Sequence, residues 1–284
     1  MTAPDPQTDS PTLVRERIVS GRCAPLSIPL RGIELREFVS NECGATAFST
    51  GTATFQPESE LPYHTHRCSE VITILSGEAV VAAEGRTYQL APYDCIHMPA
   101  GVAHRVAPAA GSSMVALYAF AAAVPSREFV HDDFRVVDCG YGQPRPTDPE
   151  YIRRFAAAEV YELSEGAFFR DLFAARFGAV GICGGYGVFR PGASLPCHFH
   201  KFDESITIVS GEAVCLVEGN LYGLSGLDTA FVPVGRVHRF LNRSDKDMAM
   251  IWVYAGSEPE RTVVDPSYCS GEARWSRRVV NHAK

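Results

Sequence analysis

Residues 192–211 read GASLPCHFHKFDESITIVSG, and this stretch holds the most informative spacing in the chain. His198 and His200 stand two residues apart, and Glu204 follows them. Successive side chains of a strand point to opposite faces, so the three donors share one face if a strand continues through them. His238, further along the chain, completes the pattern.

The same pattern occurs once more, earlier in the chain. His64, His66, Glu70 and His104 take the corresponding places there, all at the constant offset that separates His64 from His198. Between residues 55 and 105, 24 of 51 positions are identical to their counterparts at this offset, without a gap. Repetition at one fixed period over this length predicts two tandem copies of one module.

Each copy consists of short segments rich in Val, Ile, Thr and aromatic residues, such as VITIL at 71–75, separated by Gly, Pro and Asp. This composition predicts antiparallel strands in an all-β barrel or sandwich. Between the copies, residues 148–164 (DPEYIRRFAAAEVYELS) begin with Asp-Pro and are rich in Ala, which predicts a short connecting helix. We expect a leader (1–29), two barrels (30–128 and 163–262), a linker with the helix (129–162) and a tail (263–284).

The composition is that of a soluble globular protein, with 46% hydrophobic and 21% charged residues among 284. A net charge of −7 disfavours nucleic acid as a partner, and the chain has no apolar run long enough to predict a membrane span. Residues 1–17 are polar and rich in Pro, which indicates a flexible leader rather than a secretion signal, so we expect a cytoplasmic protein. Nine cysteines without a CxxC pair are predicted to be reduced thiols.

The two sets of donors predict two metal sites. A single buried histidine is more often a core residue than a ligand, but burying four such polar groups twice without a metal would be costly. Three neutral imidazoles and a carboxylate suit a divalent transition metal, Fe(II) or Mn(II) first and Ni, Co or Zn as alternatives. Such a set leaves open positions on the ion, so a substrate, water or dioxygen could bind. The predicted ligands, one set per barrel, are His64, His66, Glu70 and His104, and His198, His200, Glu204 and His238.

The stretch at 192–211 resembles the first motif of the cupin superfamily, G-x5-H-x-H-x3-E-x6-G. FVPVGRVHRFLN, at 231–242, resembles the second motif, with Pro233, Gly235, His238 and Asn242 in place and Leu227 where the family has Gly. The first copy departs more, with Glu58, Tyr93 and Pro108 at the Gly, Gly and Asn positions. The resemblance implies a two-domain bicupin of two double-stranded β-helix (jelly-roll) barrels. Because the second copy matches the family motifs more closely than the first, we expect the second barrel to hold most of the activity.

Five residues are candidates for contact with a substrate. Cys68 and Phe202 have the same parity as the ligands and are expected to face the metal, although a buried Cys is usually a small apolar residue. Tyr63 and Phe240 differ from their counterparts Cys197 and Val106, which predicts pockets of different shape. Arg190, which replaces Gln56 of the first copy, could hold a substrate carboxylate.

The resemblance implies an oxidoreductase, with a dioxygenase acting on a small chelating acid, diketone or phenol as the main hypothesis. In it Glu70 and Glu204 are ligands and candidate catalytic bases, and dioxygen is a possible second substrate. The alternatives are a metal-dependent isomerase, epimerase or lyase such as a decarboxylase, and a metal-containing binding protein without activity. Exposed sheet edges also favour a homo-oligomer.

Overall fold

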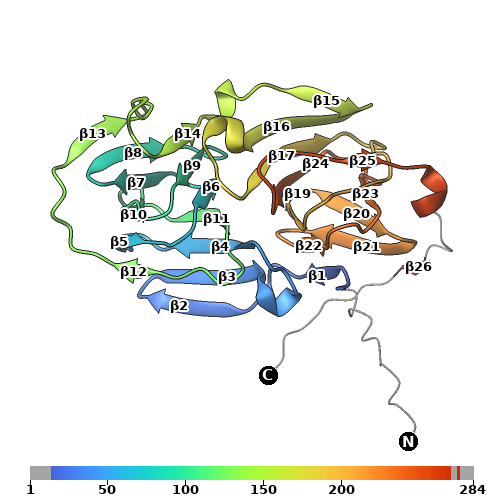
Figure 1. Ribbon diagram of the computed structural model, residues 1–284, viewed down its shortest axis with the longest axis horizontal. Coiled ribbons are helices and arrows are strands. Elements are labelled where there is room, and N and C mark those ends of the chain that lie inside the picture. Colours follow the sequence, from blue (N-terminus) through green and yellow to red (C-terminus); the bar gives the residue numbers. More distant parts are fainter. Residues whose placement is uncertain (1–13, 270–273, 276–284) are drawn as a thin grey trace, which may run out of the picture.

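The structure, a computed structural model, describes residues 14–269 and 274–275, so much of the predicted flexible leader and tail lies outside the described residues. In the described part, four sheets form two barrels that lie side by side, the first in blue and green and the second in yellow to red (Figure 1). The 3-10 turns are η1 (Asn41–Cys43), η2 (Phe155–Ala157), η3 (Ala175–Phe177) and η4 (Pro266–Cys269). The predicted all-β fold of two tandem barrels is confirmed.

Two sheets form the first barrel. In spatial order, one contains β14 (Tyr151–Arg153), β9 (Cys95–Met98), β6 (Glu70–Ser76), β11 (Met114–Phe120), β4 (Ser49–Phe55), β3 (Ile33–Val39) and β2 (Leu26–Leu30). The other contains β12 (Glu128–Phe129), β5 (Leu61–Thr65), β10 (His104–Pro108), β7 (Ala79–Ala83), β8 (Arg86–Leu90) and β13 (Val137–Gly140).

The second barrel repeats this order. Its inner sheet contains β1 (Arg17–Val19), β22 (Thr229–Val232), β19 (Glu204–Ser210), β24 (Met248–Tyr254), β17 (Cys183–Phe189), β16 (Ala167–Phe173) and β15 (Tyr161–Ser164). Its outer sheet contains β25 (Thr262–Val263), β18 (His198–Phe199), β23 (His238–Leu241), β20 (Glu212–Val217), β21 (Asn220–Ser225) and β26 (Arg274–Trp275).

The barrels exchange their first strands. β1 pairs with β22 of the second barrel, and β14, which stands at the repeat offset from β1, pairs with β9 of the first barrel. The registers correspond, because Ile18 lies opposite Ala230 and Ile152 lies opposite Ile96. The structural repeat therefore begins well before Phe55, the first of the identical residues.

The prediction of a connecting helix over residues 148–164 is wrong. The segment forms β14, the single 3-10 turn η2 and then β15. Ile152 is buried in the core of the first barrel, and the pairing of β14 with β9 satisfies the backbone, so tertiary packing outweighs the helix propensity of Ala. In the part of the chain that the structure describes, no helix is long and apolar enough to cross a membrane.

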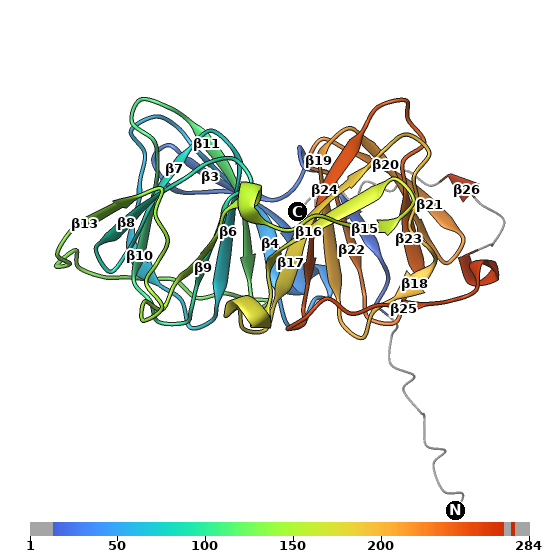
Figure 2. The same cartoon turned by 90° about the horizontal axis from the view of Figure 1, so that it is seen from above.

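Three large apolar clusters account for most of the core. One fills the first barrel around Ile74, Tyr88 and Leu90, and another fills the second around Ile208 and Phe189. A third cluster lies where the two seven-stranded sheets face each other (Figure 2). Both barrels contribute to this interface cluster, which includes Phe48, Val71, Leu117, Phe173, Phe231 and Ile251.

The residues at the family's glycine positions keep the backbone conformation that glycine would favour. Glu58, Tyr93 and Leu227 have φ values of 62°, 67° and 68°, in the left-handed region. Gly192, the counterpart of Glu58, has a φ of 83°. These departures in sequence therefore leave the loop geometry intact, although a side chain in this region carries a conformational cost.

The prediction that all cysteines are reduced thiols is wrong for two of them. Cys197 and Cys269 form a disulfide across 72 residues, while the other seven are free. Cys197 directly precedes β18 and packs with the outer apolar cluster of its barrel, where the chain returns through η4. Its counterpart in the first barrel, Tyr63, packs instead against Phe134 of the returning chain, with ring centroids 4.9 Å apart.

Candidate metal centre

Each set of predicted ligands comes from both sheets of its barrel. His64 lies on β5 and His104 on β10, where the two residues are opposite each other, and His66 follows β5 directly. The strand does not continue to Glu70 as expected, because β5 ends at Thr65 and Glu70 begins β6 in the other sheet. The carboxylate therefore reaches the imidazoles from across the barrel, and the second barrel repeats this arrangement.

The donor atoms converge in both barrels. In the first, one ligand atom each from His64, His66, Glu70 and His104 lies within 4.8 Å of the others. In the second, His198, His200 and His238 form such a group, and Glu204 Oε2 lies 2.7 Å from His238 Nε2 and 3.3 Å from His200 Nε2. All eight side chains are buried.

Backbone carbonyls orient every imidazole. In the first barrel, Nδ1 of His64 lies 2.7 Å from the carbonyl oxygen of Pro62, and Nδ1 of His104 lies 3.0 Å from that of Val102. In the second, Nδ1 of His198 lies 2.8 Å from the carbonyl oxygen of Pro196, and Nδ1 of His238 lies 2.9 Å from that of Arg236. His66 and His200 make the same bond to Ser126 and Glu260. An Nδ1–H that donates to a carbonyl leaves Nε2 as the lone-pair atom, which is the tautomer that a metal-binding histidine uses.

This arrangement fits a divalent cation. The Nε2 atoms of His66, His200 and His238 are buried without a hydrogen-bond partner. His104 Nε2 and Glu70 Oε2 face each other at 2.8 Å, and two acceptors at this distance need a positive charge between them. Donors about 2.1 Å from an octahedral ion are about 3 Å apart at adjacent positions, which matches the separations of 2.7–3.3 Å.

The protonation states also suit metal binding. Burial and the nearby His104 lower the pKa of His64 to about 3, and burial and His238 hold the pKa of His198 well below its usual range. Burial raises the carboxyl pKa, but the neighbouring imidazoles outweigh it and hold the pKa of Glu70 and Glu204 well below the usual range. Metal ligands must be deprotonated, and the shifts of His64, His198 and the two carboxylates favour that state, while Glu70 outweighs burial and raises the pKa of His66.

Two of the predicted substrate contacts, Phe202 and Phe240, pack in the second barrel, and Cys68 lies near Glu70. Phe202 stacks on the ligand His200, with ring centroids 5.5 Å apart and planes 9° apart. Cys68 is half-buried, and burial together with Glu70 raises the pKa of its thiol. Phe240 belongs to the apolar cluster that fills the second barrel.

The structure does not bring Tyr63 and Arg190 to the metal groups. Tyr63 points to the outer face of β5, where its hydroxyl accepts a hydrogen bond of 3.1 Å from the backbone of Gly85. Arg190 is exposed, and its guanidinium lies over the ring of Phe168 at 5.0 Å. The parity of Tyr63, one residue from His64, already indicates the outer face.

Sequence reasoning missed two matched arginines. Arg127 and Arg261 stand at the repeat offset from each other, in the segments whose carbonyls bind His66 and His200. The repeat continues beyond residue 105, where Pro125 and Arg127 recur as Pro259 and Arg261, and this recurrence is the signal for them in the sequence. Glu70 raises the pKa of His66, and the charge of Arg127 acts against this shift.

Comparison with known proteins agrees with this geometry. The family model described as "Cupin domain" matches residues 51–120 and again residues 185–254. No curated protein matches the chain in sequence.

Solved structures of two oxalate decarboxylases share the fold. The Lactobacillus farciminis enzyme, in its formate complex, has a TM-score of 0.72 at 16% identity, covering 87% of this chain and 88% of that one. The Bacillus subtilis enzyme at pH 4.6 has a TM-score of 0.71 at 16% identity, covering 91% of this chain and 81% of that one.

The doubled family match, the two barrels and the two buried sets of donors all lead to one assignment. The chain belongs to the cupin superfamily, as a two-domain bicupin with a His/Glu metal-binding group in each barrel.

Proposed function

We propose that this chain is a metal-dependent lyase that removes a carboxyl group from an organic acid as CO2. The observation that carries the proposal is the pair of buried His/Glu groups, in a chain that matches oxalate decarboxylases in fold over 87% or more of its length. The lyase was the alternative at the sequence level. The dioxygenase hypothesis gains no support from the comparisons.

The residues that hold the ion are the four donors of each barrel. His64, His66, Glu70 and His104 bind in the first barrel, and His198, His200, Glu204 and His238 in the second. Mn(II) and Fe(II) are the first candidates, since both accept imidazole with a carboxylate. When bound, the ion would supply a Lewis acid that withdraws electron density from the carboxylate of the substrate.

The chain itself orients the donors and excludes water. The carbonyl bonds to each Nδ1 fix the imidazole rings before a substrate arrives, so little reorganisation remains for the reaction. The rings of Phe120 and Phe202 cover His66 and His200, with centroids 4.7 and 5.5 Å away. In the reaction the bond between the carboxyl carbon and its neighbour breaks, CO2 leaves, the bonding electron pair stays on the neighbouring carbon, and that carbon takes up a proton from solvent.

The test is an assay of the full chain loaded with Mn(II), and separately with Fe(II). Oxalate and a panel of larger carboxylic acids are supplied, and CO2 release and net oxygen uptake are measured together. We expect CO2 release from at least one acid without net oxygen consumption. Oxygen consumed in proportion to substrate, with no CO2, would overturn the lyase in favour of the dioxygenase.

A further inference from the structure

A cavity of about 270 Å³ opens in the first barrel and is lined by Phe120, whose ring contacts the ligand His66. It lies where the two sheets of the first barrel part, between β2 and β3 on one side and the segment leading to β12 on the other. Ring-sized ligands fit such a space, since an apolar cavity of about 150 Å³ already accommodates benzene. The residues that line the cavity include Ser27, Leu35, Glu37, Tyr118, Phe120 and Arg127.

Arg127 brings a positive charge to this cavity without a partner of its own. No hydrogen bond or ion pair joins its guanidinium to another residue that the structure describes, and its Nε is buried and unsatisfied. A half-buried guanidinium has lost part of its hydration, so an anion that restores its hydrogen bonds is favoured. The planar guanidinium matches a carboxylate.

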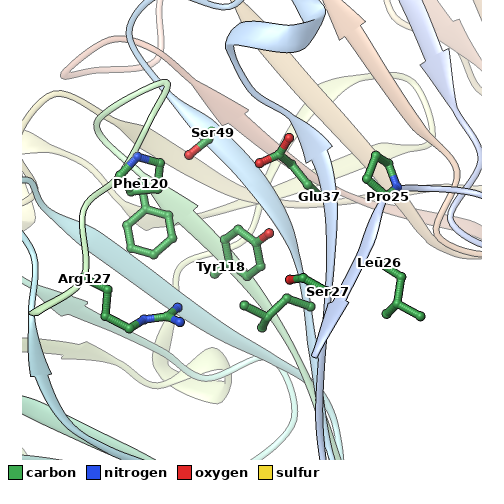
Figure 3. A pocket seen from close by; sticks show the side chains of 10 residues that line it. Pro25, Leu26, Ser27, Glu37, Ser49, Tyr118, Phe120 and Arg127 are labelled. Atoms are coloured by element: carbon green, nitrogen blue, oxygen red, sulfur yellow. The ribbon is translucent and has the colours of Figure 1, made fainter. Parts of the chain in front are cut away.

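The cavity has a basic group at one end, aromatic rings in the middle and an acidic group at the other end (Figure 3). Phe120 forms the wall next to the metal group, where its ring contacts the ligand His66 at 4.7 Å between centroids. Figure 3 shows the Tyr118 ring between Arg127 and Glu37. Glu37, whose carboxylate accepts a 2.6 Å hydrogen bond from Ser40, provides acceptor oxygens at the side away from Arg127.

Larger side chains stand at the corresponding positions of the second barrel. At the repeat offset, Tyr161 replaces Ser27, Phe169 replaces Leu35 and Trp252 replaces Tyr118. The Tyr161 hydroxyl donates a 2.7 Å hydrogen bond to Asp171, the counterpart of Glu37. Tyr161 also packs against the apolar cluster inside that barrel. The two metal groups therefore have different surroundings: the opening of the second barrel, about 490 Å³, lies at a different place, beside His200 and Arg261.

We propose that this cavity binds an organic acid larger than oxalate, with an apolar, ring-sized body and a hydrogen-bond donor at its far end. The proposal deepens the proposed function and rests on it for the statement that the acid is the substrate. Arg127 binds the carboxylate beside His66, Tyr118 and Phe120 contact the apolar body, and Glu37 accepts the bond from the donor. The first barrel, rather than the second, then selects the substrate.

Calorimetric titration of the full chain loaded with Mn(II) tests the binding step apart from turnover. The probe is para-hydroxyphenylacetate, and its uncharged amide is the matched control ligand. We expect the acid to bind, and the amide to bind about tenfold or more weakly, because the bond to Arg127 is charge-assisted.

Three variants locate the binding. Arg127→Gln is expected to weaken binding of the acid about tenfold or more, and Ser27→Tyr, which introduces the residue of the second barrel, should prevent it. Arg261→Gln, the matched change at the opening beside His200, separates the two barrels: affinity unchanged by it supports the first barrel as the binding site, and affinity lost through it instead of through Arg127→Gln overturns the inference. Metal content and melting temperature are measured for each variant, so that loss of binding can be separated from loss of folding.

The outcomes separate this inference from the proposed function. Binding of the acid that is insensitive to both Arg127→Gln and Ser27→Tyr overturns the inference. Binding and decarboxylation of oxalate alone would also overturn it, while the lyase proposal would stand. Binding of the acid through Arg127, with no CO2 from any acid, would keep the site and overturn the lyase.

Discussion

At the scale of single residues, each metal group depends on imidazoles whose second nitrogen is already bonded. Every ligand histidine has Nδ1 against a backbone carbonyl, and its Nε2 faces the other donors. A substitution therefore removes one ligand from a set whose remaining members stay oriented.

His198→Ala tests the assignment of the second group. We expect the metal content to fall from about two ions to about one per chain, because the first group is unaffected. Elemental analysis of the purified variant measures this. His131→Ala, at an exposed histidine outside both groups, is the control and should retain both ions. Two ions retained in His198→Ala would contradict the assignment.

A buried histidine without partners gives a second residue-scale prediction. His97 is 1% exposed, and neither of its ring nitrogens has a hydrogen-bond partner. Burial lowers its pKa from 6.5 to about 4, so the folded protein keeps it neutral where the unfolded chain takes up a proton. The free energy of unfolding should therefore fall as the pH decreases from 6.5 towards 4, by roughly 3 kcal/mol from this residue.

The repeat supplies the variant that tests this. Phe231 occupies the position equivalent to His97, so His97→Phe introduces the residue that the second copy uses. Urea unfolding of both proteins at several pH values should show a shallower decline for the variant below pH 6.5. Parallel declines would show that His97 does not contribute to the pH dependence.

At the scale of elements, the exchanged strands carry matched carboxylates into the opposite barrels. Glu150, which precedes β14, bonds to Arg86 at 2.7 Å and to the Tyr88 hydroxyl at 2.7 Å. Glu16, its counterpart before β1, bonds to the Tyr222 hydroxyl at 2.8 Å and to Arg236 at 2.6 Å. Each exchanged strand is therefore held by polar bonds as well as by the sheet ladder.

Glu150→Gln should destabilise the chain by about 3 kcal/mol. The Glu150 side chain is 0% exposed and makes the shortest contact to Arg86, so the change leaves the Arg86 charge only the more distant Glu84 and Asp148, at 3.4 and 3.9 Å. Chemical denaturation measures the loss. Glu128→Gln is the control, because Glu128 and Arg67 form an ion pair that is 58% and 82% exposed, and it should cost no more than about 1 kcal/mol. Equal effects would show that burial of the pair does not matter.

At the scale of the whole molecule, the strand exchange and the interface cluster make the two barrels one folding unit. Neither barrel completes its seven-stranded sheet without a strand from before the other barrel. The interface also has a polar contact, since the hydroxyls of Thr50 and Ser205 lie 3.0 Å apart. Unfolding one barrel alone would expose to water the apolar surface that the other barrel contributes to the interface cluster.

We therefore expect a single unfolding transition for the full chain in urea. Trp252 lies on β24 of the second barrel, so its fluorescence reports on that half, while far-ultraviolet circular dichroism reports on the strands of both. The two signals should share one midpoint because the barrels unfold together. Separate midpoints would mean that the barrels unfold independently.

The sequence by itself determined the duplication, the all-β barrels and the metal ligands. These features follow from local patterns, because the period of two in a strand and the spacing of donors are both written along the chain. Contacts between distant segments were decided only by the tertiary structure. They include β14 in place of the expected helix, the Cys197–Cys269 disulfide and the arrival of Glu70 and Glu204 from the opposite sheet. The placement of Arg127 near His66 was also decided only by the tertiary structure. Contacts of this kind depend on which strand edges and side chains meet after the sheets close.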